Sequence, residues 1–150
     1  MAVLEVKHLC TSFFTEAGEV KAVNDVSFSL EAGEVLGIVG ESGSGKSVTA
    51  YSILQILTYP GRIVSGSVKF DGEELVGCTD EKIRSIRGNK ISIIFQDPMT
   101  SLNPVFTIGY QLEEAILLHT GRTKTEAAAR AVEMLELVGI NEPEKRVKQY

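Results

Sequence analysis

A glycine-rich run in the first third of the sequence has the residue types and spacing of a phosphate-binding loop. Gly40-Glu41-Ser42-Gly43-Ser44-Gly45-Lys46-Ser47 fits the pattern G-x-x-x-x-G-K-[ST]. The glycines let the main chain turn so that its amides point inward at the positive end of a helix dipole, which suits a polyphosphate. Lys46 would place a point charge beside the β and γ phosphates, and the Ser47 hydroxyl would be one ligand of Mg²⁺. The residues expected to contact a nucleoside triphosphate are Gly40, Gly43, Ser44, Gly45, Lys46, Ser47 and Val48.

The elements on either side of this run provide the context that the motif requires. Glu34 to Val39 is almost continuously apolar, which is typical of a strand covered on both faces. Ser47 to Leu57 is predicted to be a helix. A strand, a glycine-rich loop and a helix in this order favour a phosphate site over a plain glycine turn with a solvated lysine.

Further strands are predicted before and after the loop. Period-2 or β-branched patterns at residues 3–9, 20–23 and 26–30 predict an N-terminal layer of antiparallel strands. Ser67 to Phe70 alternates and is followed by Asp71-Gly72, a strong turn signal. We also expect a buried strand at Lys90 to Phe95.

Helices are predicted between and after these strands. Thr79-Asp80-Glu81 provides a cap and an acidic first turn for a short helix that ends near Arg87. A helix is expected from Ile108 through Leu118. Another begins at Thr123, where Glu126 completes a capping box, and Gly139 is placed to end it. The stripe expected to be buried on this last helix is Ala128, Ala131, Val132, Leu135 and Val138.

Composition excludes several classes of protein. The 150 residues are 43% hydrophobic and 23% charged, as in an ordinary globular domain. The formal net charge is −5 and the basic residues form no long run, so the sequence does not indicate nucleic-acid binding. The apolar runs are far shorter than the roughly 20 residues that span a bilayer. The alternating N-terminus is unlike a secretory signal, so we expect a cytoplasmic chain. Cys10 and Cys78 are expected to be reduced, and His8 and His119 lack metal-ligand spacing.

A phosphate-binding loop does not by itself define the reaction. The nearest match to the base-reading motif of a small GTPase is Asn89-Lys90-Ile91-Ser92, which has serine in place of the guanine-binding aspartate. A GTPase is therefore disfavoured. A P-loop nucleotide kinase stays open, because acceptor and lid residues follow looser patterns.

The β layer, the glycine loop and the string Ile91-Ser92-Ile93-Ile94-Phe95-Gln96-Asp97-Pro98 together resemble the nucleotide-binding subunit of ATP-binding-cassette (ABC) transporters. The resemblance implies an α/β P-loop NTPase fold with ATP and Mg²⁺ as cofactors. It implies that Gln96 opens the Q-loop and contacts Mg²⁺ and the γ-phosphate region, so that Lys46 and Gln96 serve catalysis and Ser47 and Gln96 the metal. Phe13 matches the aromatic residue that stacks on adenine better than Phe14, although the two are adjacent.

The run Asp97 to Gly109 looks more specifically like the ATPases of dipeptide and oligopeptide importers, a subgroup with nickel and glutathione relatives. The resemblance implies permease subunits that contact the Q-loop region, a second ATP-binding subunit, an indirectly acting substrate-binding protein, and a peripheral location on the cytoplasmic face of the membrane. The apolar residues of this run that are expected to meet the membrane partner are Met99, Leu102, Val105 and Phe106.

The resemblance covers the N-terminal part of one nucleotide-binding domain, with the β layer and P-loop core at about 1–97 and the Q-loop and start of the helical subdomain at about 96–150. The family's LSGGQ signature, Walker B aspartate, catalytic glutamate and switch histidine do not occur, and Asp97 is a poor substitute because Gln96 and Pro98 flank it. We therefore expect a chain that binds ATP but hardly hydrolyses it. An unpaired apolar edge should remain, so that the isolated chain is marginally stable, aggregation-prone or completed by other chains. The alternative is a soluble cassette ATPase outside transport, or a remnant of one.

Overall fold

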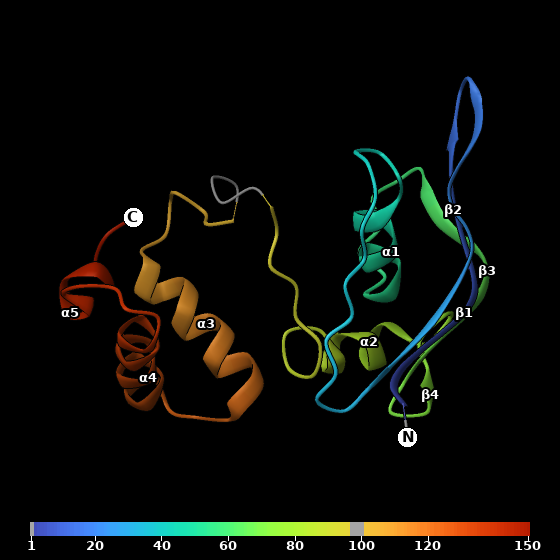
Figure 1. Ribbon diagram of the computed structural model, residues 1–150. Coiled ribbons are helices and arrows are strands. Elements are labelled where there is room, and N and C mark those ends of the chain that lie inside the picture. Colours follow the sequence, from blue (N-terminus) through green and yellow to red (C-terminus); the bar gives the residue numbers. More distant parts are fainter. Residues whose placement is uncertain (1, 97–100) are drawn as a thin grey trace. The chain divides into compact units, whose positions relative to one another are not determined.

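The computed structural model describes residues 2–96 and 101–150 (Figure 1). The chain divides into two compact units, Met1–Arg87 and Gly88–Tyr150, and each is described by itself. The first unit holds the glycine-rich loop and the second holds Gln96. In the described residues, no helix is long and apolar enough to cross a bilayer.

The first unit is built on one antiparallel sheet with the strand order β2-β1-β3-β4. The strands are β1 (Ala2–Thr15), β2 (Gly18–Glu31), β3 (Gly61–Phe70) and β4 (Glu73–Glu74). These strands confirm the predicted antiparallel β layer and the predicted hairpin turn, but residues 20–23 and 26–30, which were predicted as separate strands, form the single strand β2. Asp71 and Gly72 have φ values of 48° and 79°, as a type I′ turn requires of its central residues.

A β-bulge interrupts the pairing of β1 with β2 beside the glycine-rich loop. Thr11 pairs with Val23 and the next residue, Ser12, pairs with Lys21, so Ala22 is an extra residue on β2. A bulge bends its strand and redirects the groups of the inserted residue. Here it turns Ala22 toward the loop, as the contacts of Gly45 show below.

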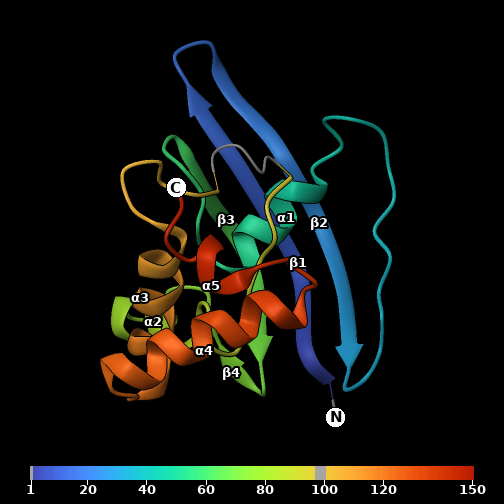
Figure 2. The same cartoon turned by 90° about the vertical axis from the view of Figure 1, so that its left-hand side faces the viewer.

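Two helices accompany this sheet, α1 (Lys46–Ile53) and α2 (Asp80–Ile86). Helix α1 lies against one face of the sheet (Figures 1 and 2). A buried hydrogen bond of 2.8 Å between the hydroxyls of Thr11 and Ser52 joins β1 to α1. The fully or nearly fully buried apolar residues of the unit include Val6, Leu9, Val23, Val68, Leu75, Ile83 and Ile86.

The ends of the two helices test their predicted bounds. Helix α2 begins after Thr79, whose side chain accepts a hydrogen bond from the Lys82 amide, as predicted. Helix α1 ends at Ile53 rather than at Leu57, so that prediction was too long. The chain leaves the helix because Gln55 adopts a left-handed conformation with φ 52°.

The predicted buried strands at Glu34–Val39 and Lys90–Phe95 are wrong. Both segments lie without strand pairing, apart from an isolated bridge at Ile91, and the side chains of Val35, Val39 and Ile94 are 94%, 93% and 97% exposed. A strand of this composition needs parallel neighbours and a cover on both faces. The described residues supply neither, so no strand forms in either segment, and the expected unpaired strand edge is replaced by exposed apolar side chains.

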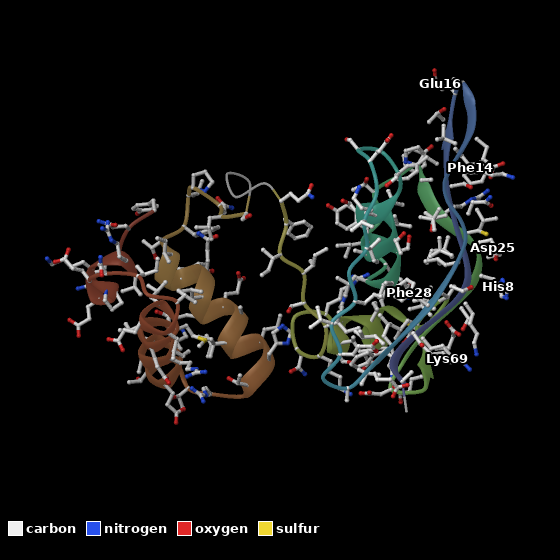
Figure 3. All side chains as sticks on the ribbon, in the orientation of Figure 1. His8, Phe14, Glu16, Asp25, Phe28 and Lys69 are labelled. Atoms are coloured by element: carbon white, nitrogen blue, oxygen red, sulfur yellow. The ribbon has the colours of Figure 1, made fainter. Side chains whose placement is uncertain are left out.

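The opposite face of the sheet carries a second irregularity. His8 and Asp25 both have positive φ values, 50° and 55°, and the His8 Nδ1 and Asp25 Oδ1 atoms lie 2.6 Å apart. Figure 3 shows both side chains on the side of the sheet away from α1. The Asp25 amide also donates to the Sγ atom of Cys10, which is a free thiol.

The second unit contains α3 (Ile108–Thr120), α4 (Lys124–Leu137) and α5 (Pro143–Arg146). The predicted starts of α3 and α4 are confirmed, and Gly139 follows α4 with φ 77°. The amides of Ile108 and Gly109 donate to the carbonyls of Gln149 and Val147, both at 2.8 Å, and so close the start of α3.

The buried stripe of α4 agrees with the predicted one at four of its five residues, and it also includes Ala127, which was not predicted. Ala127 and Ala131 are fully buried, whereas Val138, which was predicted to be part of the stripe, is 71% exposed. Ala128, Val132 and Leu135 are half-buried. Helix α4 ends at Leu137, so Val138 no longer follows the helical period that the prediction assumed.

The capping box of α4 gives a prediction for the dependence of stability on pH. The amide and hydroxyl of Thr123 both donate to the Glu126 carboxylate, at 2.8 and 2.7 Å, and these bonds hold the Glu126 pKa below its ordinary value. The stabilisation is therefore present above the unfolded-state pKa of about 4.3 and is lost as the pH falls through the lower folded-state pKa. In acid titrations followed by circular dichroism, Glu126→Gln should lose less helix across this window than the parent chain. Equal pH profiles would contradict this role.

Candidate phosphate-binding site

The glycine-rich loop forms a turn that leads directly into α1. The Ser44 amide donates to the Glu41 carbonyl at 3.2 Å, and Gly43 and Gly45 have φ values of 81° and 91°, which only glycine adopts easily. Gly45 is the N-cap of α1, and its carbonyl accepts from both the amide and the hydroxyl of Thr49, at 2.8 and 3.0 Å. The predicted strand before the loop is absent, but the predicted loop and helix are present.

The loop surrounds a hollow at the start of this helix. Its volume is about 140 Å³, and it is lined by Ala22 and by the continuous run Gly43–Val48. The first amides of a helix have no partner within the helix and carry its positive dipole charge. A hollow at this position can bind an anion without moving the main chain.

The ammonium group of Lys46 is held at the loop by the loop itself. Lys46 Nζ donates to the carbonyls of Gly40 and Glu41, at 2.8 and 2.7 Å, and lies 3.3 Å from Ser44 Oγ. These bonds place the cation beside the hollow that Gly43–Val48 lines. The loop therefore combines main-chain donors with a positioned positive charge.

The bulge on β2 supplies one wall of the hollow, which the sequence did not indicate. A Cβ atom on Gly45 would lie 2.3 Å from the Ala22 carbonyl oxygen and 3.8 Å from a methyl group of Val23. Only glycine allows this approach of the loop to the strand. Ala22 has no functional group that would mark it as part of a site. Its place beside the loop depends on the register of β1 and β2, which its own residue type does not reveal.

The adjacent residues Phe13 and Phe14 lie on opposite faces of β1. Pairing of β1 with β3 is regular from Thr11 to Phe13, so Phe13 points to the same face as Thr11, which bonds to α1. The Phe13 ring covers Gly61, where an added Cβ would lie 2.6 Å from it. Phe14 instead lies under the guanidinium of Arg62, with 4.0 Å from Arg62 Cζ to the ring centroid.

The other residues expected at the site are exposed or lie outside the description. Ser47 is exposed at the start of α1 and Gln96 is exposed in the second unit. Asp97, Pro98 and Met99 are outside the described residues. In the run that follows, Leu102, Val105 and Phe106 are exposed, and the Phe106 ring stacks on that of Tyr110 with a centroid distance of 4.8 Å.

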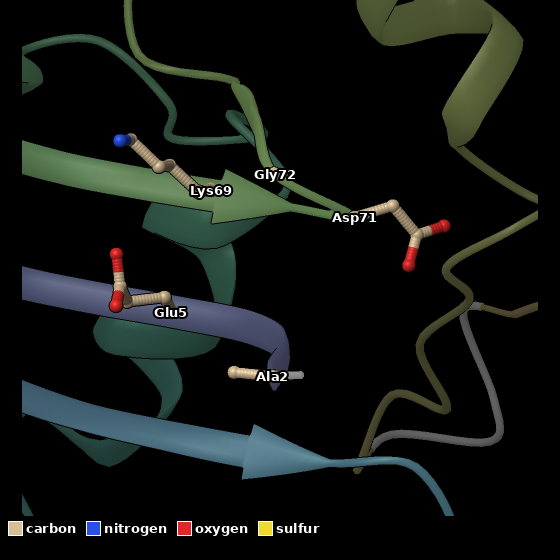
Figure 4. Close-up of a pocket in the computed structure, with 5 residues that line it drawn as sticks. All are labelled: Ala2, Glu5, Lys69, Asp71 and Gly72. Atoms are coloured by element: carbon tan, nitrogen blue, oxygen red, sulfur yellow. The ribbon is translucent and has the colours of Figure 1, made fainter.

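A larger hollow, of about 420 Å³, lies at the far end of the sheet and is lined by Ala2, Glu5, Lys69, Asp71 and Gly72 (Figure 4). It mixes charges of both signs and coincides with no motif of the sequence. Among the described residues, no group of three or more His, Cys, Asp or Glu side chains could hold a metal ion. Of these two hollows, the one at the start of α1 is the one that coincides with a motif of defined chemistry.

Solved structures identify the class of fold. The dimeric ATP-binding cassette MJ0796, in its post-hydrolysis state with ADP and Pi, aligns with a TM-score of 0.82 at 24% identity over 97% of this chain and 60% of that chain. A second dimeric structure of MJ0796, a bacterial ABC transporter cassette, aligns with a TM-score of 0.82 at 23% identity over 97% of this chain and 60% of that chain. The fold is therefore that of an ABC ATPase cassette, as predicted.

Sequence comparison identifies the family. The family model described as "ABC transporter" matches residues 23–150, and the chain belongs to this family. The chain is 50% identical over 149 residues to the oligopeptide transport ATP-binding protein OppD of Bacillus subtilis, covering 99% of this chain and 42% of that protein. It is 43% identical over 150 residues to the dipeptide transport ATP-binding protein DppD of Escherichia coli, covering 100% of this chain and 46% of that protein. The predicted resemblance is confirmed, and the chain spans less than half the length of these relatives.

Proposed function

We propose that the chain is the ATP-binding part of an importer of dipeptides or oligopeptides. The observation that carries this proposal is the hollow at the start of α1, which Ala22 and Gly43–Val48 line, with the ammonium group of Lys46 held by the loop. The names of the relatives support ATP binding and peptide transport. The test is calorimetric binding of Mg-ATP by the chain, together with the variants described below.

In the proposed complex, the amides of Gly43–Val48 hold the phosphates and Lys46 compensates the charge of the β and γ groups. Lys46 would exchange its bonds to the loop carbonyls for bonds to phosphate oxygens. Ser47 and Gln96 would hold Mg²⁺, since a hydroxyl and an amide oxygen are hard donors of the kind that Mg²⁺ accepts. Gln96 would also report the state of the γ-phosphate to the Q-loop region.

Phe13 is proposed to stack on the adenine ring, because it shares a face of β1 with the contact to α1. Phe13→Ala should weaken ATP binding by roughly tenfold, as base stacking contributes about 1–3 kcal/mol, and should leave the affinity for inorganic tripolyphosphate unchanged. Phe13→Tyr should bind ATP like the parent chain. Calorimetry with both ligands measures the difference.

Phe14→Ala is the matched control, because Phe14 lies on the opposite face with Arg62. It should bind both ligands as the parent chain does. A loss of ATP affinity in Phe14→Ala but not in Phe13→Ala would reverse the assignment.

The run from Asp97 to Gly109 supports the proposed membrane partner, because Leu102, Val105 and Phe106 are exposed apolar side chains. Permease subunits would bind there, and a second ATP-binding subunit would complete the nucleotide site at the cytoplasmic face of the membrane. A chimaera tests this role: residues 1–150 replace the matched region of the Bacillus subtilis relative, and growth on oligopeptides is scored in cells that lack that relative. Failure of a well-expressed chimaera to support uptake would contradict peptide transport.

The 150-residue polypeptide is proposed to bind ATP with little hydrolysis, because its sequence contains no carboxylate in the family's water-positioning motif. Two other classes of protein would give different results when the chain is assayed for turnover of ATP. A nucleotide kinase would transfer phosphate from ATP to a small acceptor, and a complete soluble ATPase would release phosphate without membrane subunits. Neither activity is expected from this chain.

A further inference from the structure

Arg87, the residue that directly follows α2, binds the end of α1 that lies opposite the phosphate-binding loop. Arg87 Nε donates to the Leu54 carbonyl at 2.7 Å, and Arg87 Nη2 donates to the Gln55 carbonyl at 2.5 Å. These two carbonyls follow directly after the last residue of α1, Ile53. One planar guanidinium therefore fixes two successive peptide groups, which a single ammonium cannot do with the same geometry.

The position of Arg87 answers two needs of a helix end. The carbonyls of Leu54 and Gln55, which directly follow the helix, accept hydrogen bonds from Arg87, and a cation near the end of a helix stabilises its negative pole. Helix α1 has no basic residue in its own last turn, so the cation comes from another element. Arg87 is also half-buried, so solvent screens it less than a fully exposed side chain.

The chain reversal after α1 is held on a second side as well. Gln55 has a left-handed backbone, and its Nε2 donates to the carbonyl of the fully buried Leu75. The C-terminal end of α1 is thus tied to α2 through Arg87 and to the core of the first unit through Gln55. Both ties keep the helix from rotating or sliding at this end.

A constraint at one end of α1 reaches the other because the helix is short. Its eight residues give a length of about 12 Å, and its first three residues, Lys46 to Val48, are among those that line the hollow. A tilt or a shift at the C-terminal end would therefore move the amides of Lys46 and Ser47 relative to the loop carbonyls. A cation at the negative pole also leaves the positive pole at the loop less compensated.

We propose that Arg87 is a positioning residue for the phosphate site, acting through α1 rather than by contact with nucleotide. The proposal rests on the proposed function, because it requires that the loop binds phosphate. Its specific consequence is that loss of Arg87 weakens binding of the phosphate groups, whichever base is attached. A variant that is only less stable would bind the phosphate groups with the parent affinity once its affinity is corrected for the folded fraction.

The experiment measures the affinity of the chain for Mg-ATP and for inorganic tripolyphosphate by calorimetry, on samples whose folded fraction is checked by circular dichroism. Arg87→Ala should weaken the binding of both ligands by the same factor, about three- to tenfold, as expected when a charge with two hydrogen bonds is removed from a helix end. Added guanidinium ion should restore part of the loss. Arg87→Lys should fall between the parent chain and Arg87→Ala.

Two control variants separate the loss of the Arg87 hydrogen bonds to the end of α1 from a general loss of positive charge and from a general loss of stability. Arg84→Ala removes an exposed cation from α2, and Ile86→Val weakens the core beside Arg87 without removing a donor to α1. Both should keep the parent affinity. If Arg87→Ala does not fold, Arg87→Lys decides, and parent-level affinity in that variant overturns the proposal.

The outcomes also separate this proposal from the one on which it rests. If the parent chain binds tripolyphosphate and Lys46→Ala does not, while Arg87→Ala binds like the parent, the phosphate site stands and the role of Arg87 is wrong. If Ile86→Val weakens binding as much as Arg87→Ala, the effect is one of stability and the proposal is overturned. Absence of binding by the parent chain overturns both.

Discussion

Mg-ATP binding is expected to disappear from the Lys46→Ala variant. The ammonium group is the only part of the loop that carries a full charge toward the proposed β and γ phosphates. Hydrogen bonds to charged groups contribute about 1.5–3 kcal/mol each, so the loss of one or two of them weakens affinity by roughly 100-fold or more. Calorimetry at millimolar nucleotide should show no saturable heat.

The same lysine also holds the loop, so the variant needs two companions. Lys46→Met keeps the aliphatic stem and removes only the charge, and it should lose affinity to the same extent. Lys82→Ala removes a lysine that pairs with Glu73, away from the loop, and should bind as the parent chain does. Affinity within a few-fold of the parent in both Lys46 variants would overturn the phosphate assignment.

Gly45→Ala should be the most destabilising single change in the loop. Its φ of 91° is strained for any residue with a Cβ, and that atom would lie 2.3 Å from the Ala22 carbonyl oxygen, so either α1 or the bulge of β2 must move. Strain and overpacking together should lower the free energy of unfolding by about 3 kcal/mol or more. Urea unfolding measures the loss, and nucleotide affinity should fall with it.

Gly33→Ala is the matched control for this variant. Gly33 has a φ of 77°, but an added Cβ would meet nothing within 4 Å. It should therefore cost only the backbone strain, about 1–2 kcal/mol. If the two variants are equally unstable, the close approach of the loop to Ala22 contributes nothing.

Local patterns predicted those elements whose stability comes from nearby residues. The capping box of Thr123 and Glu126, the cap at Thr79 and the turn at Asp71-Gly72 each depend on contacts within a few positions, and each is present. The strand predictions for Glu34–Val39 and Lys90–Phe95 were wrong because an apolar run becomes a strand only when other strands pair with it. Their composition is the same whether or not such neighbours are within reach.

The same distinction divides the residues of the site. The loop and Lys46 are recognisable because the motif itself encodes their geometry. Ala22 and Arg87 are not, since one depends on a register shift between two strands and the other on a meeting of two helix ends. The alternation of side chains along β1 assigns Phe13 and Phe14 to opposite faces, but which face each one takes follows only from the pairing with β3.

The strand order β2-β1-β3-β4 has a consequence for the order of events during synthesis. All four strands of the described sheet and the wall at Ala22 come from residues 2–74, so every residue that pairs in this sheet is synthesised before α3–α5. Because the N-terminal part of a chain is synthesised first, the sheet and the glycine-rich loop can assemble early. ATP in the cell could then act as a folding ligand for the emerging polypeptide.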